Sequence, residues 1–269
     1  MRRPRALAAM AALTAALLVA PAASAQAPTK TPGELVVGLS MPAAGFQVGA
    51  VRGREVLFAR GLEIDLARAL AAELAIPRVR FVNDERFAAL VALGPKDWDL
   101  ALAEITITAE RSERFAFSRP YFRADQGVLL RRGLVLGSRT LAALRGLRLC
   151  AARGSTGAAV LRREVRPRRK LRLLGNFSRL EADLYQRRCD AAIADAPRLG
   201  VLRAQAPDRV GALAGRIATG ERYGIAFERG SALRPLVDGA LARLDQDGTL
   251  GRLARRWLTA DVSGLPVLR

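Results

Sequence analysis

Histidine is absent from this chain of 269 residues, and cysteine occurs only twice. The absence of histidine excludes the Ser-His-Asp and Cys-His catalytic arrangements and every His-ligated metal site. The chain also has no Gly-x-x-x-x-Gly-Lys loop, which argues against a nucleotide-driven motor. We therefore expect no metal and no cofactor. Hydrophobic residues make up 51% and charged residues 26% of the chain, which favours one large or two small globular domains over a disordered or fibrous chain.

Lysine is scarce as well, since only three of the 44 basic residues are lysines. The formal net charge of +19 suggests nucleic-acid binding at first sight. However, the arginines are spread along the chain, and the one basic run, from Arg162 to Arg172, contains no aromatic residue. We therefore expect a solvated basic face and no nucleic-acid partner, with a field that steers small anions or an acidic partner surface toward the protein.

The amino terminus has the pattern of an export signal. Three arginines within the first five residues precede an uncharged apolar stretch, 6–20, which is too short to span a bilayer. Small residues follow at 23–25, where a signal peptidase reads them. We expect cleavage after Ala25, a polar leader arm over 26–33 and a soluble periplasmic protein.

The predicted compartment decides how the two cysteines are interpreted. Cys150 and Cys189 are either two buried thiols or a disulfide with each other. An oxidising compartment favours the disulfide.

From residue 34 onward, short apolar runs alternate with helical patterns. The apolar runs predict strands at 35–39, 79–82, 100–103, 128–130, 147–151, 171–174, 191–194 and 223–227. The helical patterns lie at 62–74, 87–93, 157–164, 178–187, 197–205, 233–244 and 250–258. Two such series predict two α/β lobes with mostly parallel sheets, in which ligands bind at the carboxyl ends of the strands.

Hydroxyl and guanidinium groups follow two of these strand ends. Thr106, Thr108 and Arg111 come after the strand at 100–103, and together they suit a carboxylate because the arginine offers a bidentate contact. Ser155 and Thr156 follow the strand at 147–151 and lie at the amino-terminal end of the next predicted helix. Alternatively, these hydroxyl groups only cap helices, and Arg111 pairs with a neighbouring glutamate.

An acidic group follows a third strand end. Asp195 comes directly after the strand at 191–194 and suits an ammonium group. A cationic and an anionic point in one cleft describe a receptor for a zwitterion, because each charge removed from water needs a partner. The alternative is that Asp195 only opens the helix behind Pro197.

These residues lie within segments that resemble a known family, the family 3 extracellular solute-binding proteins, which are periplasmic receptors for polar amino acids. The similar segments are 61–66, 106–111, 117–121, 154–157, 190–195, 223–226 and 247–249, together with Trp257. They occur in order over almost the whole predicted mature chain. The resemblance implies the type II periplasmic-binding-protein fold, with two lobes that close on the ligand around a hinge of two strands.

The resemblance also implies the domain boundaries and the partners. The first lobe would comprise 34–123 and 223–269, and the second lobe 124–222. The protein would be a monomer that delivers an amino acid to an inner-membrane ABC permease and performs no catalysis.

Residue roles carry over by position. Arg111 would bind the α-carboxylate with Thr106, Thr156 and Ser155 would close on it from the second lobe, and Asp195 would bind the α-ammonium group. Some members of the family are similar around Cys150 and Cys189 and carry a disulfide there, which supports the same pairing in this chain.

Three positions differ from the family pattern. The aromatic residue usual near Ala43 is replaced by Ala43-Ala44-Gly45-Phe46, so Phe46 is taken as the candidate ligand contact. Arg86 lies at about the position where the family commonly has another aromatic residue of the pocket, and Glu104 lies where glycine or serine is usual. Arg86 alone favours an acidic ligand, Glu104 alone a basic one, and a pair between them a nearly neutral side-chain site. Alternatively, Arg86 points to solvent.

Two other functions remain open. The fold resembles that of periplasmic cyclohexadienyl dehydratases, in which a pocket acid drives loss of water and carboxylate. Glu104 is a candidate for such an acid if burial raises its pKa, with Arg86 and Arg111 holding two carboxylates. The second alternative is a signalling or accessory module that no longer binds a ligand tightly.

Overall fold

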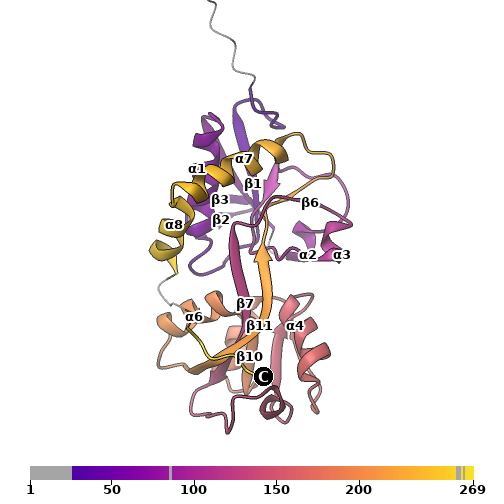
Figure 1. The fold of residues 1–269 in the computed structure, drawn as a ribbon, viewed down its shortest axis with the longest axis vertical. Helices are drawn as coiled ribbons and strands as arrows, with labels where there is room; N and C mark the ends of the chain where they lie inside the picture. The colour runs from indigo at the N-terminus through magenta and orange to yellow at the C-terminus, as the bar shows by residue number, and fades with distance from the viewer. Residues whose placement is uncertain (1–25, 85–86, 259–261, 263) are drawn as a thin grey trace, which may run out of the picture.

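The computed structural model describes residues 26–84, 87–258, 262 and 264–269. It has two lobes, with β7 (Phe122–Arg131) and β11 (Val210–Tyr223) running side by side between them (Figure 1). The predicted signal peptide and Arg86 lie outside the described residues. No helix in the described part of the chain is both long and apolar enough to cross a membrane.

The first lobe is a seven-stranded sheet covered by helices. Its central pairs, β4–β1 and β1–β5, are parallel, and antiparallel strands complete both edges. The strand order is β2 (Val48–Arg52), β3 (Glu55–Arg60), β4 (Arg78–Asn83), β1 (Glu34–Leu39), β5 (Leu100–Ala101), β12 (Ala226–Phe227) and β6 (Ala116–Phe117). The helices are α1 (Leu62–Glu73), α2 (Phe87–Leu90), α3 (Ala109–Ser112), α7 (Leu233–Gln246) and α8 (Thr249–Trp257).

The second lobe is a five-stranded sheet in the order β11, β7, β10 (Ala191–Asp195), β8 (Leu149–Ala152) and β9 (Arg172–Leu174). Its parallel pairs are β10–β8 and β8–β9. The helices are α4 (Thr156–Val160), which continues as a π-helical turn over Leu161–Val165, then α5 (Phe177–Tyr185) and α6 (Ala196–Gln205), with a 3-10 turn at Leu141–Leu144. The predicted α/β fold of two lobes is confirmed, although both sheets are mixed rather than mostly parallel.

The four-residue spacing of leucines explains how α1 packs. Leu62, Leu66 and Leu70 are buried in the first lobe's core, and Arg68 lies on the exposed side of the helix. A four-residue spacing places these leucines on one face, and burying a leucine contributes about 2 kcal/mol. This packing places α1 against β3 and β4 of the first lobe's sheet.

The two crossing strands are longer than the sequence pattern predicted. Phe122 and Tyr223, at the ends of β7 and β11 in the first lobe, pack with Phe46 in its core. Further along β7, Val128 and Leu130 belong to the core of the second lobe. Because apolar residues of one strand anchor in both cores, β7 and β11 form a continuous connection on which the lobes are mounted.

Two further segments depart from expectation. The hairpin of β2 and β3, joined through Gly53 at φ 60°, was not predicted because most of β2 is exposed and shows no apolar alternation. At the carboxyl terminus, Leu268 packs in the second lobe's core and Val267 pairs with Arg216 on β11. The end of the chain therefore contacts the second lobe rather than the first.

Cys150 and Cys189 form a disulfide, as predicted. Both residues are fully buried among the side chains that pack on α5, and the bond joins β8 to the turn before β10. The 39-residue separation closes a loop that contains α4 and α5. Closing such a loop stabilises the fold by about 2–4 kcal/mol in the chain-entropy account.

Candidate functional site

A cavity of about 160 Å³ lies between the two lobes. The loop after β1 and the segment after β5 line it from the first lobe, and the ends of β8, β9 and β10 with their following helices line it from the second. Among the predicted site residues, its wall includes Glu104, Thr106, Arg111, Ser155, Thr156 and Asp195. Five of these six residues were predicted from their positions after strand ends, and Glu104 was predicted from its departure from the family pattern.

Arg111 is held in the cavity wall without an ionic partner among the described residues. Its Nη1 donates to the backbone carbonyl of Thr106 at 2.8 Å, and its guanidinium lies 5.0 Å from the centre of the Phe87 ring. Burial lowers the pKa of Arg111, whereas the negative charges of Asp195 and Glu221 raise it. The guanidinium remains a cation in a partly desolvated site, which favours an anionic ligand group.

Thr108 and Ser155 have capping roles. The Thr108 hydroxyl accepts from the Arg111 backbone N–H at 3.2 Å and so begins α3. Ser155 caps α4 in the same way through the Ala158 N–H, also at 3.2 Å. Ser155 still lines the cavity, but Thr108 lines only a neighbouring cavity of about 1220 Å³. Thr108 thus positions Arg111, and the structure does not place it in the smaller cavity.

Asp195 ends β10 and faces the cavity from the second lobe. It occupies the position before α6, yet its side chain makes no capping hydrogen bond. Its Oδ1 accepts from the Gln126 amide at 2.5 Å, and its Oδ2 accepts from the Tyr223 hydroxyl at 2.5 Å. Both donors are neutral, so the Asp195 side chain has no ionic partner among the described residues and can meet a ligand cation.

Glu221 connects the two lobes beside this carboxylate. Its side chain accepts the Thr106 hydroxyl from the first lobe at 3.0 Å and the Thr156 hydroxyl from the second lobe at 2.7 Å. A register shift in β11 just before Glu221, with Gly220 at φ 65°, interrupts the pairing with β7. Burial, followed by the charge of Asp195, raises the pKa of Glu221.

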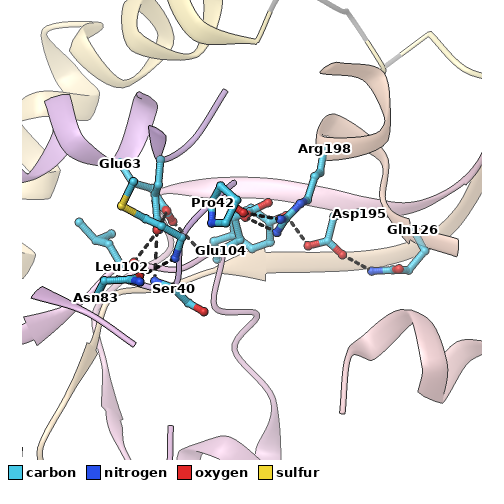
Figure 2. A network of polar contacts seen from close by, with 12 residues as sticks. Ser40, Pro42, Glu63, Asn83, Leu102, Glu104, Gln126, Asp195 and Arg198 are labelled. Atoms are coloured by element: carbon cyan, nitrogen blue, oxygen red, sulfur yellow. Dashed lines mark hydrogen bonds and ion pairs between the residues drawn. The ribbon is translucent and has the colours of Figure 1, made fainter. Parts of the chain in front are cut away.

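Glu104 and Arg198 form an ion pair across the cleft (Figure 2). Arg198 Nη1 donates to Glu104 Oε1 at 2.9 Å, and Nη2 donates to the Pro42 carbonyl at 2.9 Å. The Arg198 guanidinium also lies 3.8 Å from the centre of the Phe177 ring. Glu104 comes from the first lobe and Arg198 from α6, so this pair joins the lobes at a second place.

The Glu104 backbone lies in a strained conformation. Its φ of 52° lies in the left-handed region, which glycine adopts without strain. The conformation is held by the Glu104 N–H, which donates to the buried Glu63 carboxylate at 2.7 Å. Tyr121 and Gln47 also donate to Glu63. Burial raises the pKa of Glu104 to about 8, with Arg198 opposing and Glu63 and Asp195 reinforcing the shift.

Phe46 is a wrong site prediction. It is fully buried in the first lobe's core, with its ring 5.9 Å from Phe122 and 6.0 Å from Tyr223, and it does not line the cavity. The aromatic walls are Phe87 and Phe177 instead. The segment that carries Phe46 turns back toward α1, because the Phe46 carbonyl accepts the Glu63 N–H.

Four contributing residues were not predicted: Gln126, Phe177, Arg198 and Glu221. Gln126 and Glu221 lie on the crossing strands, whose inward faces are visible only once β7 and β11 are paired. Arg198 lies on α6, three residues after Asp195, and no spacing rule pairs it with Glu104. Phe177 follows the end of β9, where the strand-end rule had a signal.

Comparisons with known proteins agree with this architecture. The chain matches the sequence profile of the bacterial extracellular solute-binding proteins, family 3, over residues 38–260. The L-cystine-binding protein TcyJ of Escherichia coli is 28% identical over 87% of this chain and 86% of its own length. The glutamine-binding protein GlnH of Bacillus subtilis is 29% identical, and the match covers 61% of this chain and 59% of that protein.

Solved structures show the same fold. A mutant of the arginine-binding protein ArgBP from T. maritima has a TM-score of 0.72 and 27% identity, covering 84% of this chain and 96% of that one. The ancestral amino acid-binding protein AncCDT-1, a precursor of cyclohexadienyl dehydratase, has the same TM-score and identity, covering 84% and 95%. The fold is that of type II periplasmic binding proteins. The chain belongs to the bacterial extracellular solute-binding proteins, family 3.

Proposed function

We propose that this protein is the substrate-binding component of an ABC importer and that it closes on a polar α-amino acid or a related small zwitterion. The observation that carries the proposal is the placement of Arg111 and Asp195 on opposite lobes in the wall of one cavity of about 160 Å³. Both charges lack an ionic partner among the described residues, and a zwitterion supplies both.

In the bound state, Arg111 would hold the α-carboxylate, with Thr106 and Thr156 closing on it from the two lobes. Asp195 would hold the α-ammonium group, oriented by Gln126 and Tyr223. Glu221 already accepts both threonine hydroxyls, so a ligand carboxylate would take those donors from it. The relatives named for glutamine, cystine and arginine binding support an amino acid as the ligand.

The same proposal covers export and partners. The chain would be exported, cleaved after Ala25 and active as a periplasmic monomer that delivers its ligand to an inner-membrane permease. The family's extracellular location supports export. Mass spectrometry of the periplasmic protein tests the cleavage, and a mature chain that begins at residue 26 is the expected result.

A thermal-shift screen of the twenty amino acids, opines and dicarboxylates tests the function. A ligand at one hundred times its dissociation constant adds about 2.7 kcal/mol to the free energy of unfolding. Arg114→Ala, an exposed change two residues beyond α3's end, is the control that keeps the shift. The absence of any shift would contradict the proposal and would favour the accessory-module alternative.

A second candidate is a dehydratase that acts on a cyclohexadienyl carboxylate. The observation that favours it is Glu104, a buried carboxyl group in the cavity with a pKa raised to about 8, which makes it a proton donor near neutral pH. Incubation with prephenate or arogenate separates the two functions. An aromatic product that Glu104→Gln fails to form would establish the enzyme, whereas unchanged compound supports the receptor.

A further inference from the structure

The Glu104–Arg198 pair lines a part of the cavity to which the proposed zwitterion-binding residues do not contribute. Both side chains line the cavity, they come from opposite lobes, and their charged atoms lie 2.9 Å apart (Figure 2). Arg198 is further fixed by the Pro42 carbonyl and the Phe177 ring. Because the Arg198 guanidinium is fixed by three contacts, the pair is a rigid feature of the site and is suited to selecting a ligand.

When Glu104 is ionised, the pair balances its own charge, which argues against a charged ligand side chain. A cationic side chain that binds Glu104 must compete with Arg198, and an anionic one that binds Arg198 must compete with Glu104. Either competition leaves a buried charge without its partner, which disfavours binding. An uncharged side chain leaves the pair intact.

Each member of the pair also keeps one unused polar atom. Glu104 Oε2 and Arg198 Nε are buried and have no hydrogen-bond partner among the described residues. One is an oxygen and the other an N–H donor, and a buried polar group without a partner is destabilising. A ligand group that both donates and accepts would satisfy the two atoms together.

We propose that the Glu104–Arg198 pair selects an amino acid whose side chain ends in a carboxamide, as in L-glutamine or L-asparagine. The amide NH₂ donates to Glu104 Oε2, and the amide oxygen accepts from Arg198 Nε. This assignment rests on the proposed function, because it presupposes an amino acid gripped by Arg111 and Asp195. Glu104 and Arg198 are then specificity-determining residues of the same site.

The carboxamide also suits both protonation states of Glu104. The charged groups that act on Glu104 are Arg198, Glu63 and Asp195. When Glu104 is ionised, the amide NH₂ donates to it, and when it is protonated, the amide oxygen accepts from it. A cationic side chain matches only the ionised form and an anionic one only the protonated form.

Titration calorimetry with L-glutamine, L-glutamate and L-lysine tests the proposal on the wild-type protein and two variants. Wild-type protein is expected to bind glutamine at least about tenfold more tightly than either charged amino acid. Arg198→Leu leaves Glu104 unpaired and is expected to shift the preference toward lysine. Glu104→Gln leaves Arg198 unpaired and is expected to shift it toward glutamate.

Arg203→Leu is the matched control, because Arg203 lies on the same helix and does not line the cavity. Its order of ligands is expected to be that of wild type. If Arg198→Leu fails to fold, Arg198→Lys keeps the charge but removes the Nε donor, and the preference for glutamine over lysine is expected to fall about tenfold.

A wild-type preference for lysine or glutamate over glutamine would overturn the proposal, as would an unchanged order of ligands in both Arg198→Leu and Glu104→Gln. Either result leaves the proposed function standing, since an amino acid still binds. The proposed function fails separately, when no amino acid binds the wild-type protein at all.

Discussion

Two pairs of opposite charges face the same cavity, and they behave differently. Glu104 and Arg198 contact each other directly at 2.9 Å. Arg111 and Asp195 face the cavity without forming any ion pair within the described residues, and each is held instead by neutral groups, the Thr106 carbonyl for one and Gln126 with Tyr223 for the other. A pair whose opposite charges already satisfy each other shapes the wall, whereas a pair of charges kept apart requires a ligand to join it.

The largest expected effect concerns the unsatisfied pair. Arg111→Ala is expected to weaken amino-acid binding by about 3–5 kcal/mol, because the ligand carboxylate loses its charged partner in a partly desolvated site. Titration calorimetry measures the loss. Arg114→Ala is the matched control, since Arg114 pairs with Glu110 on the surface. Wild-type affinity in Arg111→Ala would show that Arg111 does not bind the ligand carboxylate.

The satisfied pair is expected to appear in the pH dependence of stability. The pKa of Glu104 is raised to about 8 in the folded protein from 4.5, so its contribution to stability is present below pH 4.5 and is lost as pH rises toward 8. Relative to Glu104→Gln, wild-type protein is expected to lose roughly 3 kcal/mol of unfolding free energy between pH 5 and pH 7.5. Urea denaturation at the two pH values measures it, and a pH-independent difference would show that Glu104 ionises normally.

Asp195→Asn is expected to weaken binding by about 2 kcal/mol, because the ammonium group keeps a hydrogen bond but loses its counter-charge. The fold should be unaffected, since asparagine still accepts from Gln126 or Tyr223. Calorimetry and a thermal melt together separate binding from stability. Unchanged affinity with an intact fold would remove Asp195 from the ligand site.

The smallest expected effect concerns Glu221, on the crossing strand β11. Glu221→Ala is expected to lower the unfolding free energy by about 1–2 kcal/mol, because the Thr106 and Thr156 hydroxyls lose their shared acceptor. Glu164→Ala, an exposed change in the second lobe, is the control. A Glu221→Ala protein as stable as this control would mean that Glu221 does not link the lobes.

The same comparison shows how far sequence reasoning reaches. Arg111 and Asp195 were predicted because each follows a buried strand, and parallel strands end at one edge of a sheet. The crossing of β7 and β11 was expected only from family resemblance, since the first residues of β7 are only partly buried and β11 varies in exposure along its length. Phe46 was wrongly predicted as a ligand contact, because an aromatic residue near position 43 in the sequence need not face the cavity. The partner of Glu104 was beyond prediction, because Arg198 is 94 residues away on the other lobe.

A double-mutant cycle tests the central claim, that Arg111 and Asp195 grip one zwitterion from opposite lobes. Wild-type protein and Asp195→Asn are each titrated with the best-bound amino acid and with its analogue that lacks the amine. The claim predicts that losing the amine costs affinity in wild-type protein but little in Asp195→Asn, with a coupling energy above about 1 kcal/mol. Equal losses in both proteins would contradict it.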